Sequence, residues 1–444
     1  MRRVRKIIIR YLRFLPAAAV LLLILLFSAA SADDKTGGVL TLDNCIDLAL
    51  KQQPNLMYYL YQIHANEAQV GQAQSGFYPS LDIQGGYSRD QLINKYNNNP
   101  FSTVINKDDY YGNVQLSQTI FDFGKTLTGV KIKNYNLLSS KKDYEAQANI
   151  TAFNVKGSYY GVIKAMRARD VDNETVTKYV KQFDQANDFY KAGTKARYDV
   201  TQAEVNLSSA KISLMNSENT LAVAWDNLTT TMGIIYDASF KIDTGFKIDE
   251  DMTPKPFGIK FEDALESAYN NRPDLMSAIA AKDAAEKNIE YAKKDYLPVI
   301  SGMASYNYDD NRFPLNNGWM AGVVVKLNIF SGFNTKYKTA EARASMDSAE
   351  TKIQSLKLSI YSGVKQSYLN LKLAADIIPA AELQVKLAQE NLDIITLKYE
   401  AGLASPVDYT DAVVQYKSAK LTYINALYNF KIAEAAILWA IGSR

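Results

Sequence analysis

The sequence predicts an internally duplicated α+β protein in which each half combines one β-hairpin with very long helices. A short motif shows the duplication: Pro54-Asn55-Leu56 returns as Pro273-Asp274-Leu275, 219 positions later. Each half also contains a long proline-poor stretch of helical composition and two segments in which apolar and polar residues alternate. A period this long is not a solenoid unit, which repeats every 20 to 50 residues or so. It indicates a duplicated half-molecule.

A second set of matching residues lies 209 positions apart. The pairs are Phe121 and Phe330, Gly193 and Gly402, Asp199 and Asp408, Lys211 and Lys420, and Gly233 and Gly442. Because the displacement falls from 219 to 209, we expect one longer loop in the first half. The two structural repeats are predicted at 33–233 and 261–444. The segment 234–260 is expected to connect the two repeats as an equatorial linker, at a level halfway along the long helices.

Residues 1–32 are predicted to be a secretory signal peptide. Six arginine and lysine residues flank the start of an apolar stretch from Phe14 to Phe27, and Ala30-Ser31-Ala32 offers a small-residue cleavage site. The apolar part is too short to span a bilayer. Its six positive charges exceed the formal net charge of +3, so the remaining chain is acidic overall and no nucleic-acid partner is expected.

The histidine and cysteine content argues against an enzyme. Cys45 and His64 are the single cysteine and histidine, whereas a zinc or copper site needs several such ligands. A Ser-His-Asp triad would require His64, which lies in a helical pattern with no nucleophile motif nearby. No glycine-rich phosphate loop stands between a strand and a helix. We expect no catalytic residues, no metal and no cofactor, and we expect both residues to pack on helix faces.

Two candidate hairpins carry one apolar and one polar face. Alternation such as Leu81 and Ile83 against Asp82 and Gln84 predicts strands. The four strands are expected at about 79–90, 110–121, 298–308 and 318–330. A soluble half-buried sheet would alternate in the same way. The strand length of about ten residues, the aromatic residues near the strand ends and the signal peptide favour strands that cross an outer membrane.

Four strands per chain cannot close around a pore. An open sheet edge in lipid would leave backbone groups without hydrogen-bond partners. If the strands cross a membrane, several protomers must therefore contribute to one barrel, and the protein is an obligate oligomer.

The predicted helices have matching lengths. Two long helices are expected at Lys125–Ala192 and Asn334–Ala401, with a kink or break at Pro379 in the second. Each would be about 100 Å long at 1.5 Å per residue. Four helices of about half that length are expected at Leu42–Gly76, Asp199–Met232, Phe261–Tyr296 and Pro406–Ile441. Two shorter helices laid end to end match one long helix. We therefore expect each long helix to run from its hairpin to a glycine turn, with shorter helices packed along it.

Several segments carry a family resemblance. They are Gln53-Pro54-Asn55-Leu56, Arg272-Pro273-Asp274-Leu275, Tyr78-Pro79-Ser80-Leu81, Ile120-Phe121-Asp122-Phe123-Gly124, and the turns that follow Tyr190 and Tyr399. In these segments, and in its repeat pattern, the chain resembles the TolC family of outer-membrane efflux proteins over essentially its whole length after the signal. The resemblance implies a homotrimer in the outer membrane of a Gram-negative bacterium. Its twelve-stranded β-barrel, with four strands from each chain, would sit in outer-membrane lipid above a periplasmic helical tunnel.

The resemblance also implies a function and partners. The chain would be the passive exit duct of a tripartite efflux or type I secretion system. Its helix tips, around Gly193, Gly402, Lys195 and Ala404, would dock to a periplasmic adaptor (membrane fusion) protein and an inner-membrane RND, ABC or MFS transporter. The alternatives are a periplasmic coiled-coil scaffold without a membrane barrel and, third, a secreted enzyme. The sequence does not identify the exported cargo.

The two turns contain the candidate gate. Glycine suits a left-handed helix cap and an aspartate suits the start of the next helix, so capping alone explains Asp199 as well as a gate does. Asp408 and Asp411 differ, because three-residue spacing puts both carboxylates on one helix face. The resemblance implies that they ring the periplasmic entrance, where they would favour cations, and that Tyr399 holds the entrance closed through a hydrogen bond to Asp199. At Ala404 some members carry an arginine that helps to lock the entrance, so closure here must rest on other contacts or be weaker.

Overall fold

The computed structural model describes residues 40–94, 103–234, 258–310 and 313–443. All helices and strands named below lie in one compact unit, Leu42–Phe240 with Glu250–Arg444. Of the second unit, Met1–Thr41 with Lys241–Asp249, only the last two residues before Leu42 are described. The predicted signal peptide and most of the predicted equatorial linker therefore lie outside the described residues.

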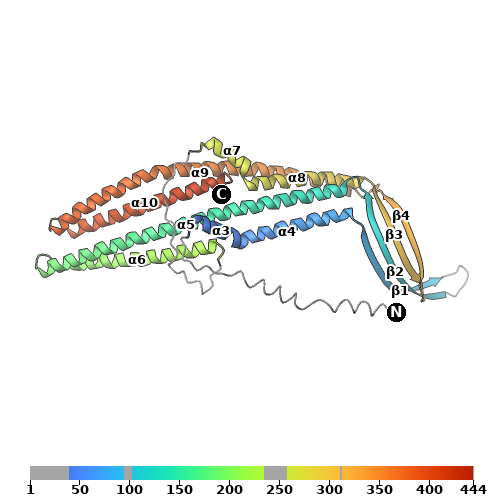
Figure 1. Cartoon of the computed structure of the whole chain (residues 1–444), viewed down its shortest axis with the longest axis horizontal. Coiled ribbons are helices and arrows are strands. Elements are labelled where there is room, and N and C mark those ends of the chain that lie inside the picture. The colour runs from blue at the N-terminus through green and yellow to red at the C-terminus, as the bar shows by residue number, and fades with distance from the viewer. Residues whose placement is uncertain (1–39, 95–102, 235–257, 311–312, 444) are drawn as a thin grey trace, which may run out of the picture. The chain divides into compact units, whose positions relative to one another are not determined.

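The first repeat has one long helix with shorter helices along it. Its helices are α3 (Leu42–Gln52), α4 (Pro54–Gln74), α5 (Lys125–Lys191) and α6 (Arg197–Thr231). Helix α5 packs against all three of the others (Figure 1). The single helix expected over Leu42–Gly76 is wrong, because Gln53 is extended with ψ 118°. Proline disfavours a helical conformation in the residue before it and suits the first position of a new helix.

The second repeat copies this arrangement. Its helices are α7 (Phe261–Asn271), α8 (Pro273–Lys293), α9 (Asn334–Glu400) and α10 (Pro406–Ala440). Helix α9 packs against the other three, and the two repeats meet where α5 contacts α8 and α10. The single helix expected over Phe261–Tyr296 is also wrong. It divides at Arg272, which is extended before Pro273 with ψ 120°.

Each break between two shorter helices receives the end of a third helix. Helices α6 and α10 end in Gly233 and Gly442, whose φ angles are +78° and +82°. A Cβ atom on Gly233 would lie 2.8 Å from Gln53 Cα, and one on Gly442 would lie 2.9 Å from the carbonyl carbon of Asn271. Glycine is therefore needed at both positions for two reasons, the left-handed backbone and the close approach to another backbone.

Helix α9 runs without interruption through Pro379, so the predicted break there is wrong. Proline removes one backbone donor and crowds the preceding turn. The neighbouring residues Ile378 and Ala381 are buried in a core that α9 shares with α10. Packing on both sides of the proline thus holds the helix together.

The four strands form one antiparallel sheet in the order β1-β2-β3-β4. They are β1 (Ser80–Asn94), β2 (Thr103–Phe121), β3 (Val299–Asp310) and β4 (Asn316–Lys326). The first hairpin is longer than expected, since β1 and β2 stay paired as far as Asn94 and Thr103. Most of the loop expected between Gln91 and Asp109 is therefore strand. In the described part of the chain, β1 and β4 each have one edge without a partner strand.

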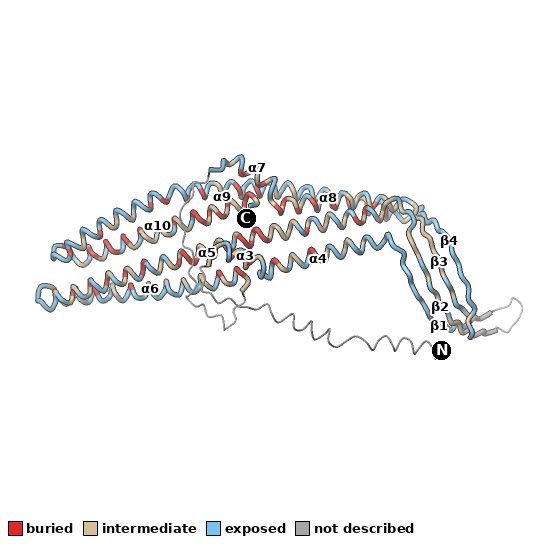
Figure 2. The backbone as a smooth tube through the Cα atoms, viewed as in Figure 1, coloured by how far each residue is buried: buried red, intermediate tan, exposed pale blue. Residues whose placement is uncertain are grey.

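One face of the sheet exposes an apolar row that crosses all four strands. Ile83 pairs with Val114, Val114 with Tyr306, and Tyr306 with Trp319. Ile83 and Trp319 are 78% and 77% exposed. Buried residues instead follow the seams between helices, as a stripe along α5 and α10 (Figure 2). Among the described helices, none has the length and hydrophobicity of a membrane-spanning segment.

Candidate gate at the helix tips

Two glycine turns join the long helices to the helices that follow them. Gly193 follows α5 with φ +73°, and Gly402 follows α9 with φ +74°. The next residues close the caps: Thr194 N donates to Phe189 O at 3.0 Å, and Leu403 N donates to Lys398 O at 2.7 Å. Both turns lie at the end of the helices that is remote from the strands (Figure 1). The predicted left-handed caps are confirmed. Near them, Lys195 is half-buried and Ala404 is buried.

Asp408 begins α10 in a capping box with Ser405. Its Oδ2 accepts hydrogen bonds from Ser405 N at 2.9 Å and Ser405 Oγ at 2.8 Å, while Asp408 N donates to Ser405 Oγ at 3.1 Å. These bonds from Ser405 lower the pKa of Asp408. The exposed carboxylate is therefore held charged and in a fixed position. The spacing Ser405-x-x-Asp408 resembles a capping-box signature and could have predicted this role.

Asp411 lies one turn further along the same face of α10 and is exposed. Within the described residues it makes no hydrogen bond or ion pair. Its charge raises the pKa of Tyr179, although burial raises that pKa more. The helices pair as two helical hairpins, α5 with α6 and α9 with α10. Asp199 starts α6, in the first helical hairpin, and is half-buried, with no side-chain cap at Ala196 before it. The tip thus carries carboxylates on both hairpins.

Tyr399 is buried in a cluster that we call the tip core. The tip core consists of Tyr179, Ala210, Leu392, Tyr399, Ala404, Tyr409, Ala412, Val413 and Tyr416. The Tyr399 ring stacks on Tyr409 with centroids 5.2 Å apart. Burial raises the pKa of Tyr399, the charge of Asp199 raises it further, and a hydrogen bond with Gln182 lowers it.

The expected hydrogen bond between Tyr399 and Asp199 is not formed in the described part of the chain. Asp199 affects the pKa of Tyr399 through its charge. The side chain that forms a hydrogen bond with the Tyr399 hydroxyl is Gln182. Gln182 is fully buried in α5, and its Nε2 donates a long hydrogen bond of 3.5 Å to Pro406 O. The sequence did not predict this residue, because nothing in the local pattern marks a glutamine as buried.

Three polar contacts hold the two hairpins together near the tip. Asn206 Nδ2 in α6 donates to Thr410 Oγ1 in α10 at 2.9 Å. Lys420 pairs with Glu174 at 2.6 Å. Lys417 Nζ lies 2.6 Å from the buried Asp172 Oδ1, an ion pair by distance that is not aligned as a hydrogen bond. In the sequence, Lys420 stands out only by its repeat match with Lys211.

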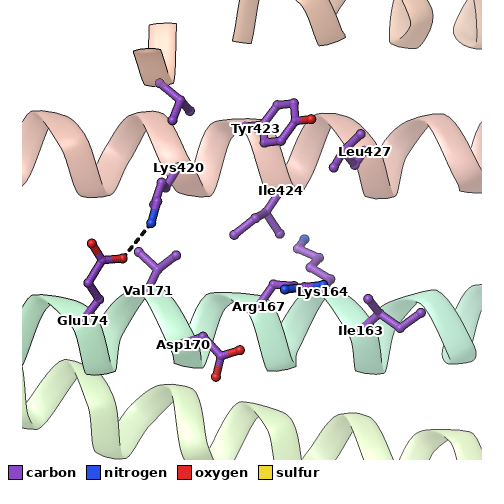
Figure 3. A pocket seen from close by; sticks show the side chains of 11 residues that line it. Ile163, Lys164, Arg167, Asp170, Val171, Glu174, Lys420, Tyr423, Ile424 and Leu427 are labelled. Atoms are coloured by element: carbon purple, nitrogen blue, oxygen red, sulfur yellow. Dashed lines mark hydrogen bonds and ion pairs between the residues drawn. The ribbon is translucent and has the colours of Figure 1, made fainter. Parts of the chain in front are cut away.

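A cavity of about 450 Å³ opens between α5 and α10 beside these ion pairs. Apolar and charged side chains both line it, and the Glu174–Lys420 pair spans one end (Figure 3). Its charged residues are Lys164, Arg167, Asp170, Glu174 and Lys420. The seam between the repeats is therefore polar and incompletely filled here.

Cys45 and His64 take no part in this site. Cys45 is buried in α3, where burial raises the pKa of its thiol to about 12. His64 is exposed on α4, where its ring and that of Tyr61 form a T-shaped pair. Among the described residues, no group of three histidine, cysteine or acidic side chains comes together as a metal site.

Comparisons with known proteins agree on one family. The model of the outer membrane efflux protein family matches residues 45–234 and 264–443. The chain is 23% identical to outer membrane protein TolC of Escherichia coli (strain K12), over 84% of this chain and 76% of TolC. It is also 23% identical to protein CyaE of Bordetella pertussis, over 91% of this chain and 84% of CyaE.

Solved structures share the fold. The Campylobacter jejuni CmeC outer membrane channel superposes with a TM-score of 0.77 at 19% identity, covering 90% of this chain and 85% of CmeC. The open state of the Neisseria gonorrhoeae MtrE outer membrane channel gives a TM-score of 0.72 at 18% identity, covering 90% and 89%. With the family model matched over both repeats, the chain belongs to the outer membrane efflux protein family.

Proposed function

We propose that this chain is the outer-membrane exit duct of a tripartite efflux or type I secretion system. The observation that carries the proposal is a sheet with an exposed apolar face joined to paired long helices, in a chain of the outer membrane efflux protein family. Such a duct is a passive conduit in the outer membrane of a Gram-negative bacterium, with a periplasmic extension. It is a channel and performs no chemical reaction.

The two sides of the chain support assembly into a closed ring. Near the tips, neighbouring helices run in the order α6, α5, α10, α9, so α6 and α9 are the outer helices. Each exposes an apolar stripe. On α6 it consists of Tyr198, Val205 and Ile212, and on α9 of Leu383, Leu387, Ile394 and Leu397. In the sheet, β1 and β4 are the outer strands. Different surfaces on opposite sides suit head-to-tail contacts, which close into a ring.

A homotrimer fits the number of strands. Three chains would supply twelve strands to one barrel and leave no strand edge in lipid. The family resemblance favours three copies over other numbers. The repeats 33–233 and 261–444, joined by the linker 234–260, would give the ring nearly six-fold symmetry.

The tips support docking to further proteins. The apolar side chain of Leu403 stands there and is 80% exposed. We propose that the turns around Gly193, Lys195, Gly402 and Ala404 dock a periplasmic adaptor protein. The adaptor would link the duct to an inner-membrane RND, ABC or MFS transporter.

We further propose that the tips form the periplasmic gate. Asp408 and Asp411 would supply six carboxylates from three chains, and an acidic ring of this kind favours cations. Tyr399 and Asp199 would contribute through the tip core and through charge. The exposed positions of Asp408 and Asp411 and the lack of ion pairs to them in the described residues support this assignment.

The proposal is tested by the location and mass of the protein. The full-length chain is expressed in a Gram-negative host, and the inner and outer membranes are separated by density. The mass of the extracted protein is then measured by native mass spectrometry. We expect it in the outer-membrane fraction, released only by detergent, with the mass of three chains. Recovery as a soluble periplasmic protein would contradict the duct and favour the coiled-coil scaffold.

A further inference from the structure

The cavity between α5 and α10, which we call the seam cavity, has the size of a small-molecule site. Its volume of about 450 Å³ falls within the range of about 300–1,000 Å³ that is usual for ligand pockets. Helix α5 of the first repeat and helix α10 of the second form its walls (Figure 3), and Val385 of α9 also lines it. A ligand held there would contact both repeats.

One part of the seam cavity is apolar. Ile163 and Val171 of α5 are buried and line it from one side. Tyr423, Ile424 and Leu427 of α10 line it from the other, with Ile424 pointing toward α5 (Figure 3). Water in contact with such side chains gains no hydrogen bonds from them, so an apolar group that displaces the water is favoured.

The seam cavity also carries an excess of positive charge. Its charged lining residues hold three positive and two negative charges. Both acids pair in addition with cations outside the lining, Asp170 with Arg169 at 2.6 Å and Glu174 with Lys178 at 3.3 Å. These cations add to the positive excess. The electrostatics of the cavity therefore favour an anion over a neutral molecule or a cation.

Lys164 and Arg167 are the side chains placed to bind the anionic group. They lie three residues apart, on the same face of α5, and both line the cavity. Lys164 points from α5 toward α10 (Figure 3), where its Nζ lies 4.8 Å from the centroid of the Tyr428 ring. A cation–π contact positions the ammonium group and leaves its charge in place. The planar guanidinium of Arg167 carries several donors, which match the oxygens of a carboxylate or a similar group.

We propose that the seam cavity is a binding site for a small amphipathic organic anion. The acidic group of the ligand binds to Lys164 and Arg167, and its apolar body packs against Tyr423, Ile424 and Leu427. The site goes beyond the proposed exit duct and does not depend on it, because the cavity lies within one chain. The proposed contacts between chains use α6 and the exposed stripe of α9, so assembly leaves the two walls of the cavity free.

The test uses naphthalene-2-sulfonate, a rigid anion with an apolar body, as the probe. Its binding to the purified full-length protein in phosphatidylcholine nanodiscs is measured by equilibrium dialysis, with empty nanodiscs as the blank. We expect saturable binding with one probe per chain. Methyl 2-naphthyl sulfone, which has a similar shape and no charge, is expected to bind at least about tenfold more weakly, since contacts to charged groups contribute that much or more.

Two sets of variants locate the site. Lys164→Gln combined with Arg167→Gln should raise the Kd of naphthalene-2-sulfonate at least about tenfold, because both cations are lost. Lys164→Arg keeps the charge and should bind the probe as the wild type does. Lys181→Gln is the control, since Lys181 is exposed on the same helix outside the lining, and it should leave the Kd unchanged.

Three results would overturn the inference. They are the absence of saturable binding to the wild type, an equal Kd in the wild type and the double variant, and equally tight binding of the neutral sulfone. None of them bears on the exit duct, because dialysis measures binding and requires no open channel.

Discussion

Asp408 and Asp411 lie one turn apart on α10 in different surroundings. Asp408 is fixed by Ser405 at the helix start, whereas Asp411 has no hydrogen bond or ion pair among the described residues. Their three-residue spacing was enough to predict a shared exposed face. The capping box follows from Ser405, which lies three residues before Asp408. Gln182 could not have been predicted, because its burial depends on how α5 meets α10.

We predict that the charges of these two residues set the ion selectivity of the channel. Asp408→Asn combined with Asp411→Asn should move the cation-to-anion permeability ratio toward one, because six negative charges leave the entrance. Asparagine keeps the shape and the capping oxygen. The measurement is the reversal potential across a planar bilayer with a salt gradient. Asp188→Asn, at an exposed aspartate near the first turn, is the control and should leave the ratio unchanged. Equal permeability ratios in the wild type, the double variant and the control would contradict the gate assignment.

The buried tyrosines predict a weakening of the tip in alkali. Burial, with contributions from Tyr179, Tyr399 and Glu400, raises the pKa of Tyr409 to about 12. Below the ordinary value of 10.0 the hydroxyl is neutral in both the packed and the separated tip. Between pH 10 and 12 the separated tip ionises first, so its stabilisation grows and the packed tip loses stability. The measurement is the difference in tyrosinate absorbance between the wild type and Tyr409→Phe. This difference should rise near pH 12, whereas a rise near pH 10 would contradict the burial of Tyr409.

At the scale of elements, three prolines show what a local pattern can predict. Pro54 and Pro273 both begin a helix after an extended residue, and Pro379 lies inside a continuous one. The presence of a proline alone does not separate these outcomes. Tertiary packing does: the ends of α6 and α10 pack against the first two breaks, while buried residues flank Pro379 on α9. The long helices and their turns were predictable because composition and glycine position suffice for them.

The glycines that end α6 and α5 should respond differently to alanine. Both have positive φ, which costs an alanine about 1–2 kcal/mol. At Gly193 a Cβ would meet nothing within 4 Å, whereas at Gly233 it would lie 2.8 Å from the Cα of Gln53. We therefore expect Gly233→Ala to destabilise the protein by about 1–3 kcal/mol more than Gly193→Ala, the usual range for overpacking. Thermal melting followed by circular dichroism compares them, and equal melting temperatures would show that the break does not require the close approach.

At the scale of the whole molecule, the duplication organises the chain. Internal matches 219 and 209 residues apart predicted two copies of a hairpin with long helices, and the structure contains both. The sequence did not predict which helices lie on the outside, because that depends on the order α6, α5, α10, α9 in the layer. The number of chains in the assembly comes from the family resemblance, since one protomer does not determine the angle between neighbours.

The apolar stripe on α6 should be required for assembly. Ile212 is 57% exposed in the single chain and would be buried against α9 of the next copy. Ile212→Asp would place a charge in that contact, where burial without a partner is strongly unfavourable. We expect monomers in place of trimers by native mass spectrometry in detergent. Ala222→Asp, on the same helix but off the stripe, is the control and should stay trimeric; trimers of the Ile212 variant would show that α6 lies outside the interface.

Single-channel recording of the purified full-length protein in a planar lipid bilayer tests the central claim most directly. A ring of chains that crosses the outer membrane and continues into a helical tunnel must conduct ions through one pore per assembly. We expect discrete conductance steps with a preference for cations. Protein that inserts into the bilayer and gives no steps, or that does not insert at all, would contradict the exit duct.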